Sequence, residues 1–65
     1  SYPPGTLVRI SSGDCGIVTG PGSRNLHAPI VRILRARTGA EVARPYEVDL
    51  SVFATYTVAE ILEDL

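Results

Sequence analysis

The sequence of 65 residues predicts one small, mainly β domain built from four to five short strands. β-Branched residues gather in short runs, and six glycines and five prolines separate these runs. The hydrophobic share of 45% is too high for a disordered segment. At this length we expect a single domain over residues 1–65 with a marginal core, which a partner or a longer parent chain would support.

The first two strands are expected to form a hairpin. Residues 6–10 (TLVRI) alternate, with Thr6, Val8 and Ile10 on one face. A polar turn, 11–14 (SSGD), separates them from a second strand at 15–19 (CGIVT). So short a polar connection is typical of a hairpin.

The middle of the chain continues the β pattern. Residues 20–29 (GPGSRNLHAP) have the composition of a loop, and 29–37 (PIVRILRAR) form the strongest predicted strand. Its apolar residues do not alternate cleanly, which predicts a bulge or burial on both faces. After a turn at 38–41, residues 42–50 are expected to be extended. Pro45 favours an edge position for this strand.

The C-terminal segment is open to two interpretations. Thr57 followed three residues later by Glu60 forms a capping-box pattern, and the apolar residues after Thr57 fall at helical spacing. Local rules therefore predict a short helix within 57–65, although the residues around Val58 are also good strand formers. Four or five strands with Gly/Pro turns and little helix predict a small SH3-like barrel.

Charge and cysteine content limit the function classes. Residues 1–46 hold all six arginines and two acids, whereas residues 47–65 hold five acids and no base. This uneven balance, with a net charge of −1, disfavours a nucleic-acid binder. No apolar run is long enough to span a membrane, and no signal peptide is visible. A single cysteine without a partner favours the cytoplasm. The absence of Met leads us to expect a piece of a longer protein.

The glycine-rich stretch 11–25 (SSGDCGIVTGPGSRN) invites three readings, of which we favour the structural one. A phosphate loop needs a helix after its glycines, and a β-rich segment follows here instead. We expect Gly16 to let two backbones pass closely. We interpret Cys15 as a small buried hydrophobe rather than a nucleophile, and His27 as an exposed loop residue. One His and one Cys are too few for a metal site, so we expect no catalytic residue, cofactor or metal.

A candidate interaction surface comprises Arg32, Arg35, Arg37, Glu47 and Asp49. The arginines could contact phosphate, and the two carboxylates could act in acid–base chemistry or hold Mg²⁺. We favour a solvated edge for the two carboxylates and a solvent-facing strand side for the arginines, balanced by the acidic C-terminal part. A second possibility is that Glu47 and Asp49 pair with Arg32, Arg35 or Arg37 across strands.

The order of the short motifs resembles a known family. "YPPGTLVRI", "GDCGIVTG", "APIVRIL", "PYEVDL" and "YTVAEIL" follow one another as in the C-terminal region of bacterial HD-GYP and related HD-domain metal-dependent phosphohydrolases. The resemblance covers roughly residues 2–62 and implies an accessory β-barrel whose closing segment is a strand. For residues 57–65 we therefore place a strand first and a terminal helical turn second. Ala28, not Asp, follows His27, and no Gly-Tyr-Pro triplet occurs, so no catalytic residue carries over. The implied partners are the catalytic part of the parent chain, another protein or a second copy.

A second resemblance supplies the alternative function. "PGTLVRISSGDCGIVTG" is similar to a KOW segment, in which a hairpin of an SH3-like barrel meets RNA or ribosomal protein. Such a module would use Arg32, Arg35 and Arg37 as its basic contacts. A typical KOW stretch carries lysines and a longer spacer, and this chain has neither.

Overall fold

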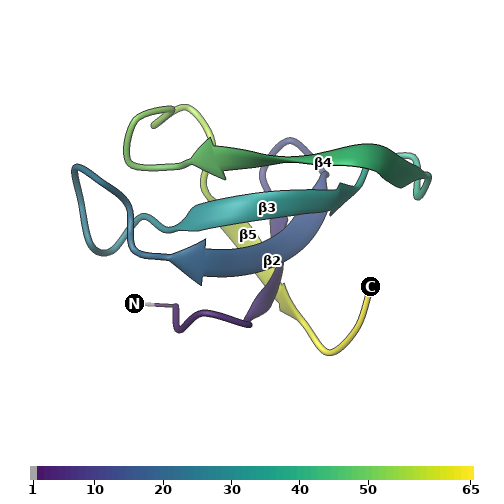
Figure 1. Ribbon diagram of the computed structural model, residues 1–65, viewed down its shortest axis with the longest axis horizontal. Helices are drawn as coiled ribbons and strands as arrows, with labels where there is room; N and C mark the ends of the chain where they lie inside the picture. Colours follow the sequence, from purple (N-terminus) through teal and green to yellow (C-terminus); the bar gives the residue numbers. More distant parts are fainter. Residues whose placement is uncertain (1) are drawn as a thin grey trace.

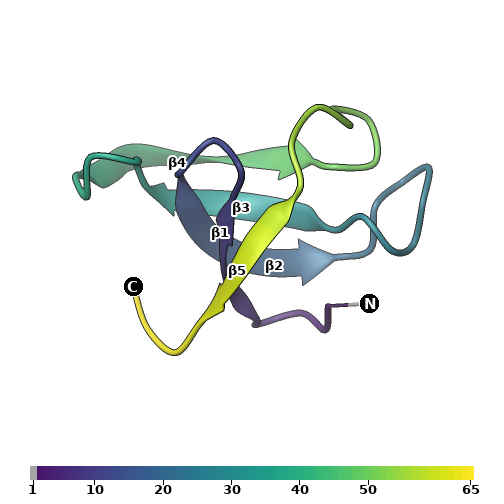
Figure 2. The ribbon, with the colours of Figure 1, turned by 180° about the vertical axis from the view of Figure 1, so that it is seen from behind.

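The computed structural model describes residues 2–65, which form one antiparallel sheet of five strands (Figures 1 and 2). The strands are β1 (Leu7–Ile10), β2 (Cys15–Gly20), β3 (Ile30–Arg35), β4 (Glu41–Asp49) and β5 (Val58–Leu62). Their order in the sheet is β4-β3-β2-β1-β5, so the last strand returns beside the first. The part of the chain described contains no helix, and hence none that could cross a membrane.

The predicted hairpin at the N-terminal end is confirmed. β1 and β2 pair in antiparallel register, with Leu7 opposite Ile17. The turn between them closes through Gly13, whose φ of 96° lies in the left-handed region that glycine adopts at little cost. The Gly13 amide donates to the Ile10 carbonyl at 2.8 Å, as a tight turn requires.

The expected irregularities of the middle strands also occur. The register shifts between Cys15 and Gly16 on β2, and between Ile33 and Arg35 on β3. These irregularities explain the broken alternation of the β3 sequence. β4, which contains Pro45, lies at one edge of the sheet, where a residue without an N–H is tolerated.

The prediction of a short C-terminal helix is wrong. Residues Val58–Leu62 form β5, which pairs with β1. Ser11 and Thr57 hold the start of this pairing: the Ser11 amide donates to the Thr57 carbonyl at 2.8 Å, and the Thr57 amide donates to Ser11 Oγ at 3.0 Å. Strand pairing with β1 and packing of Val58 on the core outweigh the local capping pattern. The alternative strand interpretation is confirmed.

The core lies between the β2–β4 part of the sheet and the β1–β5 pair, which crosses behind it in Figure 1 and in front of it in Figure 2. β2 and β3 lie close together at Gly16, where an added Cβ would lie 2.0 Å from the Arg32 carbonyl oxygen. The close passage of two backbones expected at Gly16 is thus confirmed. The buried core consists of Val8, Ile10, Val18, Val31, Ile33 and Leu50.

Candidate functional site

The predicted charged surface lies partly on the outer face of the sheet. Arg32 stands opposite Glu47 in the β3–β4 register, and Arg35 stands opposite Glu41. Arg32 and Glu47 are thus neighbours across strands, as the second possibility requires, and their ion pairing stays a prediction. This arrangement balances charge on the face rather than concentrating positive charge on it.

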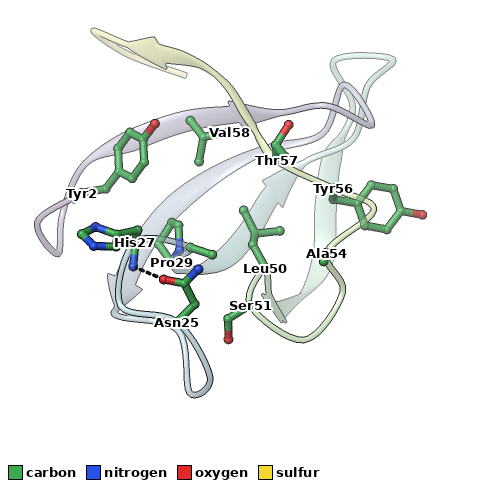
Figure 3. Close-up of a pocket in the computed structure, with 11 residues that line it drawn as sticks. Tyr2, Asn25, His27, Pro29, Leu50, Ser51, Ala54, Tyr56, Thr57 and Val58 are labelled. Atoms are coloured by element: carbon green, nitrogen blue, oxygen red, sulfur yellow. Dashed lines mark hydrogen bonds between the residues drawn. The ribbon is translucent and has the colours of Figure 1, made fainter.

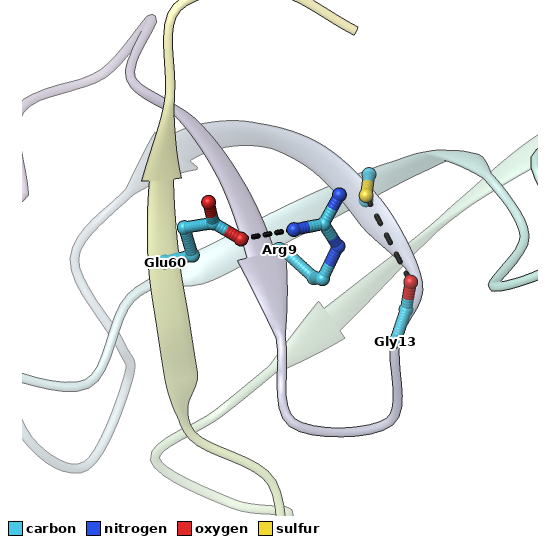
Figure 4. Close-up of polar contacts among 4 residues, drawn as sticks. Arg9, Gly13 and Glu60 are labelled. Carbon is cyan, nitrogen blue, oxygen red and sulfur yellow. Dashed lines mark hydrogen bonds and ion pairs between the residues drawn. The ribbon is translucent and has the colours of Figure 1, made fainter.

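The β1–β5 pair repeats this arrangement. Arg9 and Glu60 are opposite in register and form an ion pair on the surface (Figure 4). Both side chains are about half exposed, so the pair adds little stability.

Two of the predicted surface residues have structural contacts elsewhere. The Arg37 amide donates to Asp14 Oδ1 at 3.0 Å and joins the two hairpin turns at one end of the sheet. Asp49 lies at the end of β4 and accepts hydrogen bonds from two serines. The structure therefore does not bring all five residues into one cluster, and their role in binding stays a prediction.

Asp49 accepts four hydrogen bonds through its side chain. Oδ2 accepts from the Ser23 amide at 3.1 Å and from the Ser23 hydroxyl at 2.6 Å. Oδ1 accepts from the Ser51 amide at 3.0 Å and from the Ser51 hydroxyl at 2.6 Å. The two serine hydroxyls, followed by the backbone donors, hold the pKa of Asp49 well below its usual range, and partial desolvation opposes them.

The loop at 20–29 packs against the turn that follows β4. The Arg24 amide donates to Ser51 Oγ at 2.9 Å. Gly22 is buried so tightly that an added Cβ would lie 2.0 Å from the Ala28 carbonyl oxygen. Gly22 therefore fits a packed loop, in agreement with the structural interpretation of the glycine-rich stretch.

Cys15 lies at the start of β2, whereas His27 lies in the 20–29 loop. Cys15 is 8% exposed, with its Sγ 3.8 Å from the Gly13 carbonyl oxygen (Figure 4), and the interpretation as a buried hydrophobe is confirmed. His27 is exposed in the loop, also as expected. Within residues 2–65, no group of three or more His, Cys, Asp or Glu side chains could hold a metal ion.

One cavity of about 300 Å³ lies between the 20–29 loop and the start of β5 (Figure 3). Its polar lining is largely occupied by internal hydrogen bonds: Asn25 Oδ1 accepts from the His27 amide at 2.9 Å, and Ser51 Oγ bonds Asp49. The ring of Tyr56 points away from this cavity (Figure 3).

A second hollow, of about 340 Å³, is the strongest candidate site, and we call it the aromatic groove. Three of the four aromatic residues of the chain line it, and each is strongly exposed: Tyr46 by 50%, Phe53 by 57% and Tyr56 by 41%. Large apolar surfaces gathered around a concave site are typical of binding surfaces. The lining is completed by Ile10, Ser12, Asp14, Glu47 and Val48.

Three elements position the groove. Tyr46 and Val48 alternate with Glu47 on β4 and stand in register with buried Ile33 and Val31, so they share the core-facing side. The turn after β4 presents the other two aromatics, with the Phe53 amide donating to the Asp49 carbonyl at 2.9 Å. The β1–β2 hairpin supplies the opposite wall.

Sequence reasoning missed this groove. The candidate surface drawn from the sequence consists of charged residues alone and includes none of the aromatics. The available signal was the spacing of Tyr46, Phe53 and Tyr56, three aromatics within eleven residues on either side of a turn. Their convergence with Ile10 depends on the β1–β2 hairpin folding back toward β4, which no local pattern encodes.

No family model matches the chain, and no curated protein and no solved structure is significantly similar to it. The resemblances to the HD-type phosphohydrolase region and to KOW segments therefore stay predictions. The chain's own geometry is the basis on which a function can be inferred.

Proposed function

We propose that this chain is a non-catalytic interaction module whose binding surface is the aromatic groove. The exposure of Tyr46, Phe53 and Tyr56 around one hollow carries the proposal. Exposed aromatics are enriched at protein interfaces, because a rigid ring buries a large area at a low cost in side-chain entropy. A marginal core of six buried side chains fits a domain that gains stability from a partner.

The architecture we propose is a small SH3-like barrel. A five-stranded antiparallel order in which the last strand returns beside the first supports it. The crossing of β5 behind β2 and β3 gives the curvature that such a barrel needs (Figure 1). The aromatic groove would then lie between β4 and the β1–β2 hairpin, where no strand pairing is formed.

We further propose that the module is accessory to a cytoplasmic HD-type phosphohydrolase, whose catalytic part, or another protein, is its partner. The order of motifs over residues 2–62 supports this parent. An HD pair and a Gly-Tyr-Pro triplet encoded upstream of residue 1 would support it, and an unrelated upstream domain would contradict it. The isolated chain should not hydrolyse cyclic di-GMP in the presence of Mn²⁺, and turnover would contradict a non-catalytic role.

A selection from a random dodecapeptide library on the immobilised chain tests the groove. We expect enriched peptides that lose binding to the Phe53→Ala variant and keep it with Leu26→Ala. Leu26 is the matched control, since it is 69% exposed and lies outside the groove. Peptides that bind both variants equally, or a selection without enrichment, would contradict the proposal.

A further inference from the structure

We propose that the aromatic groove binds a peptide segment carrying an arginine or lysine beside apolar residues. This inference rests on the proposed function and names the chemistry of the partner. The lining contains two acids, Asp14 and Glu47, and no basic residue. A cationic side chain is therefore the complement of this groove, whereas an acidic segment or a phosphate backbone would be repelled.

Asp14 supplies the charge on the hairpin wall. Its Oδ2 accepts from the Ser12 hydroxyl at 2.8 Å, and its Oδ1 accepts from the Arg37 amide at 3.0 Å. Both donors are neutral groups, so they hold the carboxylate in place without cancelling its negative charge. Asp14 is half-buried, which weakens solvent screening of its interaction with a ligand.

Glu47 contributes less than Asp14 to this complementarity. The alternation of β4 places its side chain on the outer face, opposite Arg32, while Tyr46 and Val48 face inward. Glu47 therefore borders the groove along the free edge of β4, and Arg32 offsets part of its charge. We assign the main cation contact to Asp14.

The aromatic walls suit the same ligand. Arginine and lysine cations are attracted to the faces of aromatic rings, and the groove offers three such rings, from Tyr46, Phe53 and Tyr56. The aliphatic stem of the cationic side chain and its apolar neighbours would cover Ile10 and Val48 on the floor. The cavity beside His27 does not combine aromatic rings with a carboxylate, because no acidic residue is among its described lining residues.

Binding of two labelled peptides to the 65-residue chain tests the inference. Both are nonapeptides of leucine and proline; one has a central arginine, and the other has citrulline, the neutral isostere of arginine. We expect the arginine peptide to bind about fivefold more tightly than the citrulline peptide at low salt. This ratio of affinities is the upper limit expected for a partly exposed ion pair. This advantage should disappear in 1 M NaCl, because salt screens the charge but not the apolar contacts.

Two substitutions with matched controls locate the contact. Asp14→Asn can keep an acceptor for the Arg37 amide while removing the charge, so the advantage of the arginine peptide should be lost. Asp64→Asn makes the same charge change at an exposed C-terminal position and should leave the advantage unchanged. Should Asp14→Asn fail to fold by circular dichroism, the salt dependence and the citrulline comparison on the unmodified chain still decide the inference.

The outcomes separate this inference from the proposed function. If the two peptides bind equally and Phe53→Ala weakens the binding of both, the cationic preference is overturned, but the groove remains a binding surface. Binding that is unaffected by both Phe53→Ala and Asp14→Asn contradicts the groove itself. Absence of binding by either peptide overturns the inference, while the library selection still tests the groove independently.

Discussion

Asp49 Oδ2 accepts a hydrogen bond from the Ser23 hydroxyl at 2.6 Å, across 26 positions of the chain. This contact joins the 20–29 loop to the turn after β4. The carbonyl of Asp49 also accepts from the Phe53 amide within that turn. One residue thus connects the glycine-rich loop to the segment that presents the aromatic groove.

Asp49→Asn should lower the free energy of unfolding at neutral pH, because an amide cannot accept from both serines through two oxygens. The folded-state pKa of Asp49 is depressed, so its contribution is present above its unfolded pKa of about 3.9. The contribution is lost as pH falls below that value toward the folded-state pKa. Urea unfolding at pH 7 and pH 3 should show a smaller difference between variant and parent at pH 3.

The matched control for this experiment is Asp64→Asn, at an exposed position near the C-terminus. We expect it to change stability little at either pH. A difference between parent and Asp49→Asn that grows as pH falls would contradict the assigned hydrogen bonds.

Gly16→Ala should destabilise the protein by more than about 2 kcal/mol, because the added methyl group would meet the Arg32 carbonyl oxygen on β3. Gly20→Ala, in the same strand, is the control. Its Cβ would meet nothing within 4 Å, and we expect a change within about 0.5 kcal/mol. Urea midpoints compare the two, and equal midpoints would rule out the close approach of β2 and β3.

Ile33→Ala should cost about 2–5 kcal/mol, since Ile33 is completely buried in the core. Native proteins have stabilities of about 5–15 kcal/mol, so this variant should lose a large fraction of its stability and unfold at a clearly lower temperature. Ile61→Ala, at a residue 64% exposed, should change stability by about 0.5 kcal/mol or less. Thermal unfolding followed by circular dichroism distinguishes them, and a similar loss in both would contradict the placement of the core.

Glu60→Gln should cost at most about 1 kcal/mol, because its ion pair with Arg9 lies on the surface. The difference from the parent protein should shrink further in 1 M NaCl. A loss of several kcal/mol in urea unfolding would contradict the assignment of this pair to the exposed surface.

Much of the fold could be predicted from local chemistry. The alternation of β1, the turn at Gly13 and the edge position of Pro45 each follow from a residue's own backbone preferences. The C-terminal strand could not be predicted from local rules, because Thr57 and Glu60 match a helix start. Pairing of β5 with β1, nearly 50 residues earlier in the chain, decides its structure.

The aromatic groove could not be predicted from local sequence rules for a similar reason. Sequence patterns identified charged residues of β3 and β4, of which Arg32 and Glu47 are neighbours across strands, but not the meeting of Tyr46, Phe53 and Asp14. These residues come from a strand, a turn and a distant hairpin, and only the folded topology brings them together.

The most direct test of the aromatic groove as the binding surface is a titration of the ¹⁵N-labelled chain with the arginine peptide, followed by amide NMR. We expect the largest shift changes at Asp14, Tyr46, Phe53 and Tyr56, with small changes at Arg32 on the outer face. If the largest changes in chemical shift occur at Arg32 and Arg35, and the amide shifts of the groove residues stay constant, the groove is not the binding surface.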